Sequence, residues 1–283
     1  MFLLPLWLVL ALLTGLTSNA HNFLNRYVLK DGDDSTAYAW YFELGNTVFF
    51  LALALFDWRF ILTPYSLLLY VLVGVTEFLA IYWYMKMHSY SELSISSILS
   101  RTRMIWVAIF AFFLVNEQLR LIDYVGILTI FLGVSLTSAP KKLFIDKGAQ
   151  YANLSAVMIA INLILIKLLL PFGSDAVINV TRGIPALIIF PLLMKNSAPR
   201  LKKVLLTKQK FRIPAVVFSG LSIICFTAAL HVGDASKINA VYQGMMILSV
   251  LAGIIFLKER GSIGRKIFGA IITIIGVVVL SLS

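Results

Sequence analysis

The chain has 283 residues, of which 60% are hydrophobic and 13% charged, and its formal net charge is +11. Soluble domains are typically about 45–50% apolar and about 25% charged, so this composition excludes a soluble globular protein. The basic residues lie in short connectors between apolar runs, which is typical of membrane orientation signals and argues against nucleic-acid binding.

Ten apolar runs are long enough to cross a bilayer as helices, which takes about 20 residues each. Lipid offers no partner to unpaired backbone groups, so each run is predicted to be helical. The first run resembles a signal peptide but lacks a positively charged start, and we interpret it as an uncleaved span. The spans are predicted at 2–19, 35–56, 64–85, 91–115, 121–139, 150–170, 174–194, 213–232, 235–257 and 263–282.

Spans two, three and seven each contain an ionisable residue, namely Glu43, Glu77 and Arg182. A charge at mid-membrane costs about 2.5–3.5 kcal/mol, so it needs a partner, a water-filled cavity or a function. Aligning "AYAWYFE" (37–43) with "AVINVTR" (176–182) places Glu43 opposite Arg182, and these two are predicted to form a buried charge pair. Glu77 is then the candidate for binding solute or exchanging a proton, because burial favours the neutral form of an unpaired carboxyl group.

Span four carries Arg101 near its middle, and Ser97 lies one turn before it on the same face. A guanidinium offers planar, paired donors that suit a carboxylate or phosphate of a solute. The alternative is structural: Arg101 pairs with Glu77 or Glu43, and the serine allows close helix packing. Arg103 lies about 200° around an ideal helix from Arg101, so both cannot face one small site.

Span nine offers Asn239, Tyr242 and Gln243, and Asn239 can share one helix face with either Tyr242 or Gln243. In the alignment of the two halves Gln243 overlies Arg101. A cation in one half and a neutral amide in the other suit a solute with one anionic end. Ordinary hydrogen bonding between helices remains the alternative.

Each half of the chain closes on a similar pattern. An apolar helix end meets an acid, Glu117 or Glu259, and the helix that follows has two glycines seven residues apart. In addition, "ELS" at 92–94 aligns with "DAS" at 234–236. The two glutamates lie at helix ends beside water, so they are predicted to be helix caps or gate contacts. The alternative is that apolar sequence of low complexity aligns readily with itself.

The pattern divides the chain into two five-helix repeats, 1–139 and 140–283. Because five is odd, the two copies must enter the membrane from opposite sides, as in the inverted repeats of many transporters. The fold class expected is therefore an all-α polytopic membrane protein with ten transmembrane helices in two inverted repeats. Most lysines and arginines follow odd-numbered spans, which places the 195–212 connector in the cytoplasm and both termini outside.

Ten spans in two halves, closed by "NEQL…G…G" and "KERG…G…G", resemble the drug/metabolite transporter superfamily, specifically its EamA-type branch. The opening "LVLALLTGLTSNAHNFLNRYVLK" also looks like that family's first span. The resemblance implies secondary transport or export of small metabolites by alternating access, without ATP hydrolysis. Family members generally keep both termini in the cytoplasm, whereas the charges here favour the opposite orientation.

The function predicted is secondary transport, with export favoured, of an amino acid or another carboxylate-bearing solute through a midplane cavity. Proton coupling or solute exchange would drive it. The expected partners are the solute and membrane lipid, without nucleic acid, and a homodimer is left open; in a bacterium the location would be the inner membrane. Neither a cofactor nor a metal site is expected, and no nucleophile–base pair, aspartate pair or metal motif points to an enzyme. The alternatives are a membrane scaffold or assembly subunit and a membrane-embedded enzyme.

Overall fold

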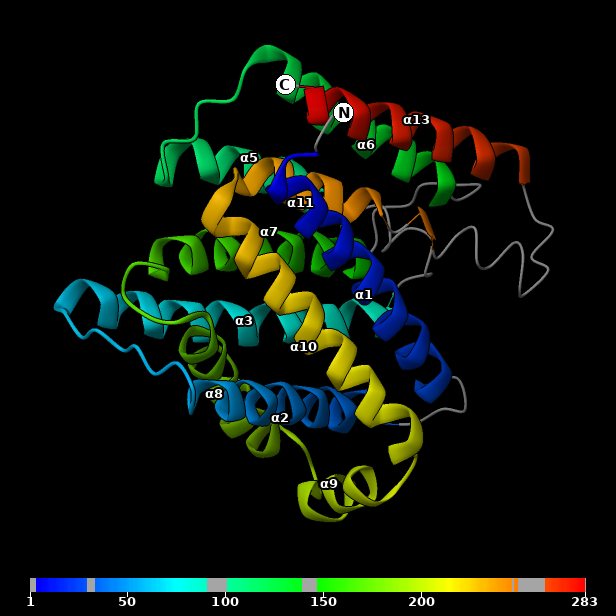
Figure 1. The fold of residues 1–283 in the computed structure, drawn as a ribbon. Coiled ribbons are helices and arrows are strands. Elements are labelled where there is room, and N and C mark those ends of the chain that lie inside the picture. The colour runs from blue at the N-terminus through cyan, green and yellow to red at the C-terminus, as the bar shows by residue number, and fades with distance from the viewer. Residues whose placement is uncertain are drawn as a thin grey trace.

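The fold was analysed in a computed structural model that describes residues 4–29, 34–90, 101–138, 147–245, 247–248 and 263–282. Over these ranges the regular structure is helical, with one isolated antiparallel bridge between Phe60 and Gly173 (Figure 1). This confirms the predicted all-α class.

Every predicted span contains a described helix. The first half of the chain contributes α1 (Leu6–Leu29), α2 (Ser35–Ala54), α3 (Pro64–Tyr90), α5 (Arg103–Leu114) and α6 (Leu121–Ser138). The second half contributes α7 (Lys147–Leu169), α8 (Asp175–Leu193), α9 (Ser197–Leu206), α10 (Gln209–Val232), α11 (Ala235–Gly244) and α13 (Ile263–Leu282). Within the described residues, the helices long and apolar enough to cross a membrane are Pro64–Tyr84, Gln150–Leu169, Asp175–Leu193, Gln209–Val232 and Gly264–Leu282.

Helix α1 and the connector between α8 and α10 show two of the larger differences from the sequence prediction. Helix α1 continues to Leu29, well beyond the expected end at residue 19, because polar residues in its second half find partners inside the protein. The connector between α8 and α10 contains α9, a short amphipathic helix with basic residues and exposed leucines. Its length of ten residues is too short to span a bilayer.

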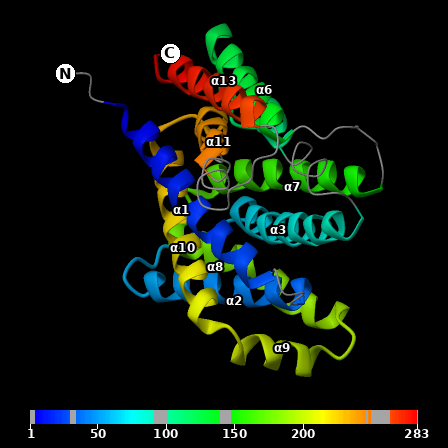
Figure 2. The same cartoon turned by 90° about the vertical axis from the view of Figure 1, so that its right-hand side faces the viewer.

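Helix packing follows a two-fold pattern that relates the two halves. Helix α1 packs along α10 and touches α11, and correspondingly α7 packs along α3 and touches α5. Helices α2 and α8 pair with each other, as do α6 and α13. Figures 1 and 2 both show α6 and α13 side by side at one edge of the molecule and α9 at the opposite edge. Most large interfaces therefore join one half to the other.

The repeated glycines lie where α6 and α13 touch. A Cβ atom added to Gly133 would lie 2.6 Å from the backbone nitrogen of Thr273, and one added to Gly269 would lie 2.6 Å from the carbonyl oxygen of Gly133. Small residues at such crossings let two backbones meet in a membrane. The glycine spacing noted in the sequence thus marks a packing surface.

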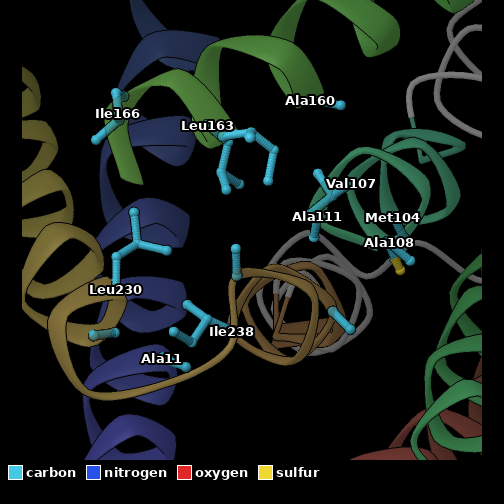
Figure 3. Packing of buried hydrophobic residues seen from close by; sticks show 14 of the residues in the cluster. Ala11, Met104, Val107, Ala108, Ala111, Ala160, Leu163, Ile166, Leu230 and Ile238 are labelled. Carbon is cyan, nitrogen blue, oxygen red and sulfur yellow. The ribbon is translucent and has the colours of Figure 1, made fainter. Parts of the chain in front are cut away.

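The main apolar core also draws on both halves. Figure 3 shows Val107 and Ala111 of α5, Leu163 of α7, Leu230 of α10 and Ile238 of α11 converging between these helices. All five belong to one cluster of buried residues. The largest cluster of buried apolar residues is therefore shared between the two halves.

Candidate functional site

A polar centre forms around Tyr242 of α11, where four helices meet. The Tyr242 hydroxyl lies 3.2 Å from Oγ of Ser18 in α1, at hydrogen-bond distance. The guanidinium carbon of Arg103, the first residue of α5, lies 5.1 Å from the centroid of the Tyr242 ring. Phe226 of α10 packs edge-on against the same ring, with centroids 5.8 Å apart. We call Ser18, Arg103 and Tyr242 the Tyr242 centre.

Helix α1 approaches the end of α11 closely enough for direct backbone recognition. A Cβ atom on Gly15 would lie 2.2 Å from Cβ of Met245, so only glycine fits there. Asn19 donates from Nδ2 to the carbonyl oxygens of Gly15, at 2.7 Å, and Met245, at 2.8 Å. Asn22 Nδ2 lies 3.5 Å from Oγ of Ser18. A polar stripe on α1 therefore runs into the Tyr242 centre.

The predicted solute-binding residues of spans four and nine lie in adjoining elements, since α5 packs on α11. Arg101, Asn239 and Gln243 are buried, and Nδ2 of Asn239 has no hydrogen-bond partner among the described residues. The arginine over the Tyr242 ring is Arg103. The predicted angle of about 200° between Arg101 and Arg103 assumes that both lie in one helix. It does not apply, because Arg101 lies in the turn before α5. Ser97 lies outside the described residues.

Sequence reasoning missed Ser18, Asn19 and Arg103. The first two lie near the end of the shorter span that was expected, where polar residues suggest a membrane boundary. A usable signal was present: Ser18 and Asn22 are four residues apart and so share one helix face. A continuous helix through both would have placed them inside the bundle.

A second group of charges joins α2, α3 and α8. Nη2 of Arg182 lies 3.4 Å from Oε1 of Glu77, and Glu43 is buried next to this pair. We call Glu43, Glu77 and Arg182 the acidic cluster. The expected partners were Glu43 and Arg182, so the structure corrects the pairing: the backbone of α8 at Gly183 packs against α2 beside Glu43, while Arg182 itself reaches α3.

Glu117 connects the two halves at one end of the bundle. It follows Asn116, whose φ of 55° turns the chain sharply after α5. The buried carboxylate accepts hydrogen bonds from Nζ of Lys167 at 2.7 Å, the backbone nitrogen of Ala235 at 2.7 Å and Oγ of Ser236 at 2.8 Å. A carboxylate is favourable at a helix N-terminus, because unpaired N–H groups and the helix dipole attract negative charge. Glu117 thus caps α11 in the other half.

The same end holds a second ion pair between the halves. Nζ of Lys237 in α11 lies 2.9 Å from Oδ1 of Asp123 in α6, and Asp123 is buried. Burial and the nearby Glu117 carboxylate raise the pKa of Asp234, which precedes α11. Glu259, the repeat counterpart of Glu117, lies outside the described residues.

At the opposite end of the bundle, α9 of the second half contacts the first half. Asp34 caps α2 by accepting from the backbone nitrogen of Ala37 at 3.1 Å, and it forms two hydrogen bonds with Arg200 of α9, at 2.5 and 2.9 Å. The hydrogen bond from Arg200 lowers the pKa of Asp34. Lys208 donates to the carbonyl oxygen of Val28 near the end of α1, at 3.0 Å. Contacts between the halves are therefore present at both ends.

Among the described residues, no group of three or more His, Cys, Asp or Glu residues is placed to hold a metal ion.

A family model and a solved structure each match nearly the whole chain. The sequence model of the EamA-like transporter family matches residues 5–139 and again residues 146–282. One solved protein structure aligns with 96% of this chain and 96% of its own, with a TM-score of 0.74 and 16% identity, which shows a shared fold. A search of the curated proteins finds no match.

Proposed function

Because this chain belongs to the EamA-like transporter family, whose members are membrane transporters of small solutes, we propose that it is a secondary transporter that exports a small carboxylate-bearing metabolite such as an amino acid. The chain is an integral, multi-pass membrane protein.

The observation that carries the proposal is the Tyr242 centre. Arg103 and Ser18 belong to the first half and Tyr242 to the second, so a solute held there would contact both. A guanidinium binds a carboxylate through two parallel hydrogen bonds, and the adjoining hydroxyl groups accept or donate to the rest of a polar solute. The proposal also assigns Arg101, Asn239 and Gln243 to this site, because they are buried in or next to α5 and α11, which pack together.

Alternating access is supported by the contacts at the ends of the bundle. Glu117–Lys167 and Asp123–Lys237 join the halves at one end, and Asp34–Arg200 joins them at the other. Rocking of one half against the other around a fixed central site would break one set while the other holds. Glu117 then serves as a gate contact as well as a helix cap. The distribution of basic residues assigns the α9 end to the cytoplasm.

A scaffold or assembly role is the second candidate, and the buried ion pairs favour it because they also hold helices together. It predicts that removing a buried charge lowers the amount of folded protein and moves no solute. A transporter predicts a loss of flux at an unchanged protein amount.

The test is solute uptake and counterflow in proteoliposomes, with amino acids and organic anions as the solutes. Wild type, Arg103→Gln and Arg101→Gln are reconstituted at matched amounts, and Lys202→Gln, which removes a positive charge from exposed α9, is the control. We expect flux in wild type and the control and a strong loss in Arg103→Gln. Normal flux in both arginine variants would remove the proposed site, and absence of flux in wild type would favour the scaffold.

A further inference from the structure

The acidic cluster holds more negative than positive charge. It contains two carboxylates, Glu43 and Glu77, and one guanidinium, Arg182, which is paired with Glu77 at 3.4 Å. The Glu43 side chain is 6% exposed. Within the part of the chain that the structure describes, it makes no hydrogen bond or ion pair. The acidic cluster therefore has one guanidinium for two carboxyl groups at membrane depth, where an uncompensated charge is costly.

Two polar side chains of α2 near Glu43 lack hydrogen-bond partners among the described residues. A Cβ atom on Gly183 of α8 would lie 3.7 Å from Oε2 of Glu43 and 2.2 Å from Oγ1 of Thr47, so all three groups meet at one point. Oγ1 of Thr47 and Oδ1 of the buried Asn46 have no hydrogen-bond partner among the described residues. The site thus offers hydrogen-bonding atoms to a carboxyl group that gains or loses a proton.

Charged groups on the other helices near α2 lie away from Glu43. Arg200 of α9 and Arg212 of α10 are engaged near the N-terminal end of α2. His21 of α1 contacts the ring of Phe42, with centroids 5.8 Å apart. The charges that act on Glu43 are consequently those of the other two members of the acidic cluster.

We propose that Glu43 is the proton-binding residue of a proton-coupled cycle, with the Arg182–Glu77 pair acting as a fixed positioning pair beside it. This inference rests on the transport function proposed above. Glu43 takes up one proton from water at one end of the bundle and releases it to water at the other. Closed packing favours its neutral form, and hydration favours the carboxylate.

The position of Glu43 couples this proton to the motion of the halves. Helix α2 belongs to the first half and α8 to the second, and Glu43 lies at the contact between them, beside Gly183. Rocking therefore changes the hydration of Glu43 directly. The helices of the acidic cluster do not contribute to the Tyr242 centre, so proton and solute occupy separate sites.

The experiment compares wild type with Glu43→Gln in proteoliposomes that contain a trapped pH indicator. Two quantities are measured: solute counterflow at equal pH on both sides, and proton movement driven by a solute gradient. Glu43→Gln is expected to keep counterflow, at a rate that no longer depends on pH, and to lose proton movement to the level of empty vesicles. The control is Asp175→Asn, which removes a carboxylate paired with His231 outside the cluster and should behave as wild type.

The outcomes separate this inference from the transport proposal. Proton movement in Glu43→Gln equal to wild type, or counterflow in wild type without proton movement, overturns the inference and leaves transport standing. If wild type moves no solute, infrared difference spectra of wild type against Glu43→Gln decide. A protonated carboxyl band at neutral pH that the variant lacks supports Glu43 as a proton-binding residue, and its absence in wild type overturns the assignment.

Discussion

Nζ of Lys167 lies 2.7 Å from Oε1 of Glu117, and this ion pair joins the second half of the chain to the first. Lys167 also donates to the carbonyl oxygen of Gly233 at 3.0 Å, and Glu117 caps α11. Three segments from different parts of the sequence are thus fixed at one end of the bundle.

Removing one partner of this pair should destabilise the protein. Removing one partner of a buried ion pair lowers the free energy of unfolding by about 3–5 kcal/mol. We expect Lys167→Met to lie near the lower end of this range, because the Lys167 side chain is 20% exposed. Thermal unfolding in detergent measures the change. The double variant Glu117→Gln/Lys167→Met should recover part of the loss, because no lone charge is left. If the loss of stability in the double variant equalled the sum of the losses in Glu117→Gln and Lys167→Met, the two groups would not interact.

The crossing of α6 and α13 should not tolerate a side chain at Gly133. In Gly133→Ala the new methyl group meets the backbone of Thr273 and Gly269, so the helices must separate. Overpacking of this kind costs about 1–3 kcal/mol. Gly264→Ala is the matched control on α13, because nothing lies within 4 Å of its Cβ position. Equal melting temperatures for the two variants would contradict the close crossing.

The contribution of the Asp34–Arg200 pair should depend on pH. The pKa of Asp34 is lowered in the folded protein, first by the hydrogen bond from Arg200. The pair therefore stabilises the folded protein fully above the ordinary aspartate pKa of about 3.9. This stabilisation is lost as the pH falls through the lowered pKa of Asp34 in the folded protein. Both side chains are about one-third exposed, so we expect at most about 1 kcal/mol. Unfolding of wild type and Arg200→Gln should differ at pH 7 and converge in acid; a constant difference would contradict this.

The Tyr242 hydroxyl should affect solute affinity more than protein amount. Tyr242→Phe keeps the ring next to Arg103 and removes the hydrogen bond to Ser18. In the proposed site the same hydroxyl binds the solute, and loss of that hydrogen bond, worth about 1 kcal/mol, corresponds to a several-fold rise in the apparent KM for uptake. Tyr242→Leu, which also removes the ring, should reduce uptake further. A KM equal to wild type in Tyr242→Phe would place the solute away from this hydroxyl.

The sequence by itself determined the membrane class, the approximate positions of the helices and the family. These follow from local properties: a run of about 20 apolar residues must be helical in lipid whatever surrounds it. The start of α2 at Ser35 and that of α3 at Pro64 coincide with their predicted positions. The "NEQL" and "KERG" corners, with their paired glycines, led to the family that the whole-chain match then showed.

Only the tertiary structure decided which polar groups meet. Arg182 pairs with Glu77 and not with the aligned Glu43, and Glu117 caps a helix that begins at Ala235, far along the chain. Hydropathy reports how well one segment fits lipid and carries no information on the rotation of that helix against its neighbours. That rotation is set by packing, as where Gly183 lets α8 close onto α2, and it determines the partner of every buried charge.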